Sequence, residues 1–102
     1  MDVGIIGDEE TVLGYRLLGI PGWVAGGEDQ ALECFRTAIE RAELELLLLT
    51  GPVQRQLAGQ VASHRRRGGR PLIGVVASLS GEATAGEELE ELVRRAIGIK
   101  AQ

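Results

Sequence analysis

The stretch Leu44-Glu45-Leu46-Leu47-Leu48-Leu49-Thr50 is the strongest strand signal in the chain, because its leucine run is interrupted only by Glu45. A second apolar run, Val3-Gly4-Ile5-Ile6-Gly7, stops at the acidic residue Asp8. A short run of this kind, apolar at nearly every position, is typical of a strand buried on both faces, as in a parallel sheet. These two runs therefore predict the inner strands of an α/β fold.

Two weaker runs predict the remaining strands, and helical patterns fill the intervals. Trp23–Ala25 is short and flanked by glycines, which fits an edge strand, and Pro71–Ala77 is the fourth run. Asp8 is expected to cap the first helix and Asp29 begins the second. Apolar residues at helical spacing predict the buried faces of three helices, namely Val12, Leu13, Leu17 and Ile20, then Ala31, Leu32, Phe35, Ala38, Ile39 and Ala42, then Val53, Leu57 and Val61.

The last part of the chain predicts a loop and a fourth helix. Residues 78–86 are small and polar, and Thr84 followed by Glu87 fits a capping box. The cleanest amphipathic face in the chain follows, formed by Leu89, Leu92, Val93, Ala96 and Ile97. Gly98 can end that helix.

Alternating strands and helices predict one α/β domain over residues 1–102, with a core at 1–77, a loop at 78–86 and a C-terminal helix at 87–98. We expect a three-layer, Rossmann-like (receiver-like) fold with a four-stranded parallel sheet of order 2-1-3-4 and helices on both faces. Ligands of such folds bind beyond the carboxyl ends of the strands, where the strand order reverses. Here Asp8 and Thr50 would line that crevice.

Composition narrows the class of function. The chain has 102 residues, a net charge of −4, three aromatic residues in all (one Phe, one Trp and one Tyr) and a single cysteine. The acidic balance and scarce aromatics argue against nucleic-acid binding. No signal peptide and no apolar run of membrane-spanning length is visible, so we expect a cytoplasmic protein without direct membrane insertion.

The crevice lacks the residues that catalysis or cofactor binding would need. Asp8, Glu9 and Glu10 could suggest a phospho-accepting magnesium site, but no carboxylate ends the third strand and the only lysine is Lys100. The first strand-to-helix turn also lacks the glycine spacing of a dinucleotide site. We expect no catalytic residue, no metal ligand and no cofactor.

Three other features of the sequence receive structural interpretations. Cys34 is expected to be half-buried and unreactive, and His64 to be a solvated histidine at a helix end. The cluster Arg65–Arg70 is expected to be a solvated basic turn, with a protein contact as its functional alternative.

Two stretches are not explained by the fold alone. Gly14 lies inside a predicted helix, where glycine costs about 1 kcal/mol relative to alanine, unless a backbone or a partner approaches closely. Ile97 and Ile99 would be poorly covered at a free terminus.

These stretches resemble two motifs of the F subunit of the vacuolar/archaeal-type rotary ATPases. The family pattern Gly-Asp-x-x-Thr-x-x-Gly-Phe-x-Leu-x-Gly matches here at Gly7, Asp8, Thr11, Gly14, Tyr15, Leu17 and Gly19, with Tyr15 in place of phenylalanine. The family ending Arg-Arg-Ala-Ile-Gly-Ile matches Arg94 to Ile99. The chain departs from the family at Ala25-Gly26-Gly27 and at Leu18, where small residues are common.

The resemblance implies a non-catalytic subunit of the central rotor, bound to the coiled-coil D subunit that forms the shaft. Such a protein turns with the shaft that couples ATP turnover to proton or sodium transport, as a peripheral part of a membrane-bound complex. Its C-terminal helix can extend along the shaft toward the catalytic head. The expected interface residues are Thr11, Gly14, Tyr15, Arg16, Leu92, Arg95, Ala96, Ile97 and Ile99. The alternatives are a receiver-like signalling adaptor without a phosphorylation site, and a regulatory domain that self-associates through its last helix.

Overall fold

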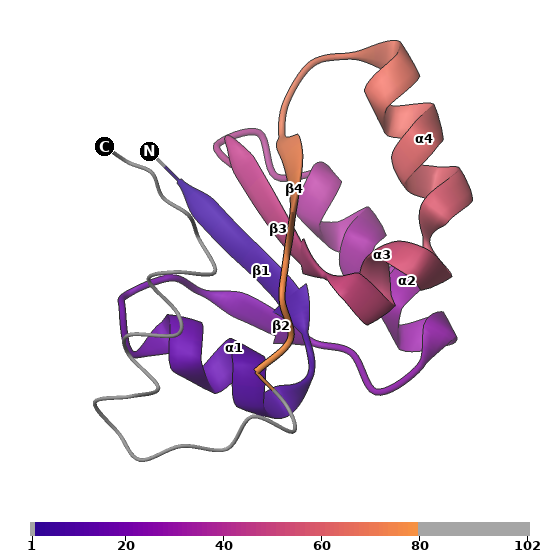
Figure 1. Cartoon of the computed structure of the whole chain (residues 1–102). Helices are drawn as coiled ribbons and strands as arrows, with labels where there is room; N and C mark the ends of the chain where they lie inside the picture. Colours follow the sequence, from indigo (N-terminus) through magenta and orange to yellow (C-terminus); the bar gives the residue numbers. More distant parts are fainter. Residues whose placement is uncertain (1, 80–102) are drawn as a thin grey trace.

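The four apolar runs form the four strands of one parallel sheet in the computed structural model, which describes residues 2–79 (Figure 1). The strand order is β2-β1-β3-β4, as the sequence predicts. The elements in chain order are β1 (Val3–Gly7), α1 (Glu9–Arg16), β2 (Gly22–Val24), α2 (Glu28–Ile39), β3 (Leu46–Thr50), α3 (Gly51–Gln56), α4 (Ala58–Arg67) and β4 (Leu72–Val76). The α/β class, the parallel sheet and its order are therefore confirmed, whereas the predicted helix at 87–98 lies outside the described residues.

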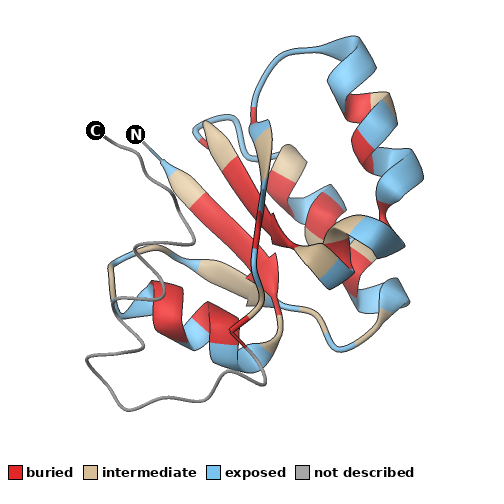
Figure 2. Ribbon diagram, in the orientation of Figure 1, coloured by how far each residue is buried: buried red, intermediate tan, exposed pale blue. Residues whose placement is uncertain are grey.

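The two inner strands are the most deeply buried part of the molecule (Figure 2). β1 pairs with β3 in the register Ile5↔Leu48, and four of the five residues in each strand are buried. This is why their sequences are almost continuously apolar and do not alternate.

Each face of the sheet carries its own apolar core. The larger core lies between the sheet and α2, α3 and α4, and its buried members are Ile6, Ala31, Phe35, Ala38, Leu44, Leu47, Leu49, Val53, Leu57 and Val61. The smaller core lies on the α1 side and contains Ile5, Val12, Tyr15, Leu48, Val76 and Leu79. Helices thus pack on both faces, as expected.

The predicted third helix is wrong in one respect, because it is divided into α3 and α4 at Leu57. The backbone of Leu57 departs from helical geometry, with φ −111° and ψ 24°. The amide of Leu57 still donates to the Val53 carbonyl at 3.0 Å, and the amide of Val61 to the Leu57 carbonyl at 2.8 Å. All three side chains consequently stay buried on one face, which is the part of the pattern that the sequence could reveal.

The predicted inner face of α1 is wrong for two of its four residues, since Val12 is buried and Ile20 packs on the small core but Leu13 and Leu17 do not. Leu13 and Leu17 are 51% and 68% exposed, while Val12 and Tyr15 face the core. Helical spacing identifies a set of residues on one side of a helix but not which side meets the sheet. The helix ends at Arg16 and the chain turns at Gly19, which adopts φ +86°.

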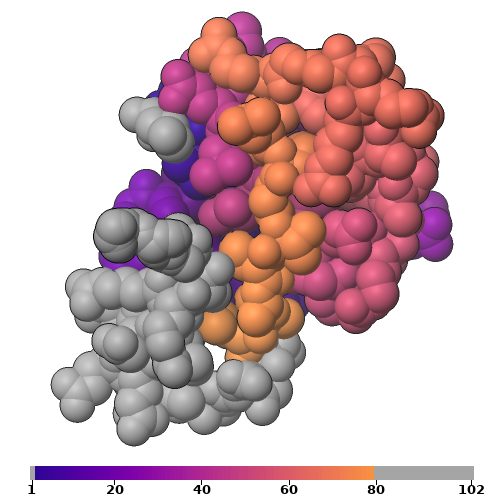
Figure 3. Space-filling model, turned by 45° about the horizontal axis from the view of Figure 1, so that its top comes forward, coloured from indigo at the N-terminus to yellow at the C-terminus, as the bar shows by residue number. Residues whose placement is uncertain are grey.

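β4 is an exposed edge strand that lies along the surface (Figure 3). Leu72 is 66% exposed and Val75 is 50% exposed. The Arg65 guanidinium donates from Nη2 to the Ile73 carbonyl at 3.1 Å. A cationic side chain bound along an open edge discourages pairing with a strand of another molecule.

The side chain of His64 corrects a further expectation, because it is only 6% exposed and not solvated. Its Nε2 lies 2.7 Å from the carbonyl oxygen of Pro71, and a carbonyl can only accept, so Nε2 carries the proton. The ring also meets Phe35 edge-on, with centroids 6.3 Å apart. His64 follows Val61 by three residues and so shares its inward face, which places it between α4 and the entry to β4.

None of the helices within residues 2–79 combines the length and apolar content that crossing a bilayer requires. Residues 65–70 are exposed, as predicted, but Arg65, Arg66 and Arg67 form the last turn of α4 and only residues 68–70 lie in the turn that follows. Two glycines in this turn, Gly68 and Gly69, adopt positive φ angles of 77° and 89°.

We predict that His64→Ala lowers the free energy of unfolding by about 2–3 kcal/mol, because it leaves the Pro71 carbonyl unpaired and opens a cavity beside Phe35. Urea denaturation measures this. Gln60→Ala, an exposed change on the same helix, should stay within about 0.5 kcal/mol of wild type. Equal midpoints for the two variants would contradict the structural role of His64.

Candidate functional site

The carboxyl ends of the strands are the first place to seek a site, and Asp8 is the central residue there. Its Oδ2 accepts a hydrogen bond from the Thr11 amide at 3.2 Å, which caps the N-terminus of α1 as the sequence predicts. Its Oδ1 accepts from the Thr11 hydroxyl at 2.8 Å and from the Ser78 hydroxyl at 2.6 Å. The carboxylate therefore connects the start of α1 with the chain that leaves β4.

The environment of Asp8 keeps its carboxyl ionised. Partial burial alone would raise its pKa, but the hydrogen bonds from Ser78 and Thr11 outweigh burial and hold the pKa below its usual value of 3.8. A general acid or base working near neutral pH needs a pKa shifted the other way. Asp8 is thus suited to holding structure and not to transferring protons.

The ends of β1 and β3 lie close together beside Asp8. A Cβ atom placed on Gly7 would lie 2.6 Å from Cγ2 of Thr50, so the two strand ends approach as closely as a glycine permits. Thr50 itself is buried and caps α3, with Oγ1 accepting from the Val53 amide at 3.5 Å. Both residues expected to line the crevice therefore serve as helix caps.

Two further side chains bear on possible chemistry. Cys34 is a free, half-buried thiol, as predicted; burial and then the nearby Glu33 raise its pKa, which disfavours the reactive thiolate. Across residues 2–79 there is no cluster of three or more His, Cys, Asp or Glu side chains that could hold a metal ion.

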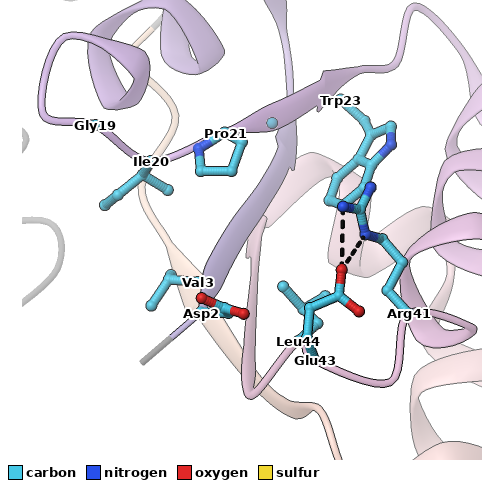
Figure 4. Close-up of a pocket in the computed structure, with 10 residues that line it drawn as sticks. Asp2, Val3, Gly19, Ile20, Pro21, Trp23, Arg41, Glu43 and Leu44 are labelled. Atoms are coloured by element: carbon cyan, nitrogen blue, oxygen red, sulfur yellow. Dashed lines mark hydrogen bonds and ion pairs between the residues drawn. The ribbon is translucent and has the colours of Figure 1, made fainter.

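A cavity of about 430 Å³ lies at the opposite, amino end of the sheet (Figure 4). Arg41 borders it, paired with Glu43 at 3.2 Å and placed 5.8 Å from the centroid of the Trp23 ring. With its guanidinium occupied by these two neighbours, Arg41 is held as part of the wall. The rest of the lining comes from Asp2 and Val3 at the start of β1, from residues 19–23 at the entry to β2, and from Glu43 and Leu44 before β3. All of these lie far from Asp8 and Thr50 in the sheet.

The structure divides the first group of predicted interface residues. Thr11, Gly14 and Tyr15 are buried inside the domain, whereas Arg16 is exposed. The second group (Leu92, Arg95, Ala96, Ile97 and Ile99) lies outside the described residues. Interface roles for all of them stay predictions.

The exposed side of α1 carries residues that sequence reasoning missed. Leu13 and Leu17 stand four positions apart and flank Arg16, so the three side chains share the outer face of the helix. We call this set the α1 outer face. Helical spacing places Leu13 and Leu17 on one side of the helix, but it does not show that this side faces solvent.

Tyr15 has an unusual environment. Its side chain is 0% exposed, and its hydroxyl has no hydrogen-bond partner among the residues described. Burial raises the pKa of the phenol to about 12. An unpaired buried hydroxyl costs on the order of 1–3 kcal/mol, so the ring and not the hydroxyl contributes stability here.

The chain is similar to known proteins over nearly its whole length. A family model described as "ATP synthase (F/14-kDa) subunit" matches residues 3–99. The F subunit of the A-type ATP synthase of Thermococcus kodakarensis is 31% identical over 105 residues, covering 98% of this chain and 97% of its own length. The F subunit of the V-type ATP synthase of Thermus thermophilus is 30% identical over 100 residues, covering 94% and 95%. The matches thus span the α/β domain and the C-terminal stretch together.

We predict that Tyr15→Phe raises the free energy of unfolding by about 1 kcal/mol, because it keeps the buried ring and removes the unpaired hydroxyl. The effect should grow in alkaline solution. The unfolded chain loses the Tyr15 proton near pH 10 and the folded chain only near 12, so wild type loses stability as the pH rises through this interval.

Urea denaturation of both proteins at pH 7 and pH 11 measures the two effects. Tyr15→Leu serves as the control, since it loses the ring and should be less stable than wild type. A phenylalanine variant that is less stable than wild type at both pH values would show that the hydroxyl is paired in solution.

Proposed function

Because the chain belongs to the family of the ATP synthase (F/14-kDa) subunit, and its relatives are F subunits of A-type and V-type ATP synthases, we propose that it is a non-catalytic subunit of the central rotor. In this role it binds the coiled-coil D subunit of the shaft. It helps to couple or regulate ATP turnover in a cytoplasmic, peripheral part of a membrane-bound complex that moves protons or sodium ions.

A non-catalytic role is supported by the use of the polar groups at the carboxyl ends of the strands. Asp8 and Thr50 both cap helices, and Thr50 packs directly on Gly7. The two polar side chains expected at the ligand site of a receiver-like fold are therefore engaged in helix capping. The proposed role accordingly relies on the surface of the domain.

The single observation that carries the binding role is the α1 outer face. Leu13 on α1 and Leu17 at its C-cap are both more than half exposed, and they present apolar area to solvent next to the positive charge of Arg16. Fully burying a leucine stabilises a complex by roughly 1.5–3 kcal/mol, so covering both would raise the affinity by about tenfold or more. The groove or ridge of a coiled coil is a surface onto which such a helix can pack.

The predicted C-terminal helix is the second contact in this proposal. Its apolar stripe (Leu89, Leu92, Val93, Ala96 and Ile97) can lie either on the domain's own sheet or along the shaft toward the catalytic head. Only one placement can be occupied at a time, so a partner that favours one depletes the other. This competition is the basis for a regulatory role.

We predict that Leu13→Gln combined with Leu17→Gln weakens binding to the shaft protein of the same complex by about 10–100-fold, because the apolar area of the α1 outer face is lost. Isothermal titration with the purified shaft protein gives the dissociation constants. Leu72→Gln is the matched control: Leu72 is equally exposed but lies on β4, so it should bind like wild type. Wild-type affinity in the double variant would refute docking through α1.

We also predict that Leu92→Gln with Ile97→Gln alters the ATPase rate of the reconstituted complex by at least about twofold, since both changes fall on the apolar stripe. Glu88→Gln with Glu91→Gln, two changes on the opposite face of the predicted helix, is the control and should leave the rate unchanged. An unchanged rate and unchanged shaft affinity in the stripe variant would remove the C-terminal helix from the mechanism.

A further inference from the structure

The chain that leaves β4 is hydrogen-bonded to the start of α1. Ser78 and Leu79 follow the edge strand β4, whereas α1 packs over β1 and β2 at the other side of the sheet. The Ser78 hydroxyl donates to Asp8 Oδ1 at 2.6 Å, and the Leu79 amide donates to Thr11 Oγ1 at 2.8 Å. The bonded residues are about 70 positions apart in sequence, with separations of 70 and 68.

These bonds form one connected chain. The Leu79 amide donates to the Thr11 hydroxyl, which donates in turn to Asp8 Oδ1. The same oxygen also accepts from Ser78. A hydroxyl that donates to a carboxylate becomes a better acceptor, so the Leu79 bond is strengthened by the charge on Asp8.

The arrangement does more than cap a helix. Capping α1 needs only the bond from the Thr11 amide to Asp8 Oδ2. The Thr11 hydroxyl oxygen and Asp8 Oδ1 each accept a further hydrogen bond from the segment after β4. Thr11 is fully buried and Leu79 is 4% exposed. The amide hydrogen of Leu79 can therefore exchange with water only when the small core opens.

We propose that Asp8 and Thr11 are positioning residues that clamp Ser78 and Leu79 to the first turn of α1, and thereby fix the point from which residues 80–102 depart. The Gly-Asp-x-x-Thr motif thus has a role at the root of the C-terminal segment in addition to its role at the helix start. The clamp is a property of the isolated chain and does not depend on the proposed function.

Amide hydrogen exchange of the full chain, followed residue by residue with NMR, tests the clamp. In wild type the Leu79 amide should be protected. Ser78→Ala removes one donor to Asp8 and leaves both bonds between Asp8 and Thr11, so the protection factor of Leu79 should fall about tenfold, while those of β1 and β3 amides change little. Thr11→Val should lower the protection factor of Leu79 further than Ser78→Ala does. Thr11→Ser keeps the hydroxyl, so its Leu79 protection factor should stay close to that of wild type.

Thr50→Val is the matched control, because it removes the corresponding side-chain cap of α3 without touching Ser78 or Leu79. It should lower protection throughout the chain and not at Leu79 in particular. An unprotected Leu79 amide in wild type, or an unchanged Leu79 protection factor in Ser78→Ala, would overturn the proposal whether or not Thr11→Val folds.

Discussion

The pairing of β1 with β3 is the constraint on which the rest of the structure depends. Both strands are buried on both faces, so each face of the sheet must be covered by helices. Among residues 2–79, α2, α3 and α4 cover one face of the sheet and α1 packs on the other. Within eight residues α1 packs on the small core, starts at the Asp8 cap and bonds to the chain that leaves β4.

The inner and outer residues of α1 have separate roles, one in folding and one at the surface. Its inner residues are Val12 and Tyr15, which pack in the small core, and Thr11, which is hydrogen-bonded to Asp8. The outer residues Leu13 and Leu17 remain in solvent. A helix divided in this way can present apolar side chains to a partner without loosening the domain, because the two faces share no side chain.

Much of this could be predicted from the sequence, and the failures have physical causes. The strands were evident because buried parallel strands are continuous apolar runs, and the Asp8 cap was evident because its chemistry is local. Leu13 and Leu17 were assigned to the core because spacing alone does not say which side of a helix meets the sheet. The break at Leu57 was invisible since the Val53–Leu57–Val61 spacing survives it. His64 was placed in solvent because its partner, the Pro71 carbonyl, is brought to it only by the turn into β4.

The central claim is that the chain acts by docking on the rotor shaft, and its most direct test is the mass of the complex formed with the shaft protein. Size exclusion with light scattering on an equimolar mixture should give a single species with the summed mass of one copy of each protein. Separate elution of the two proteins, or a homodimer of this chain that ignores the shaft, would contradict the account.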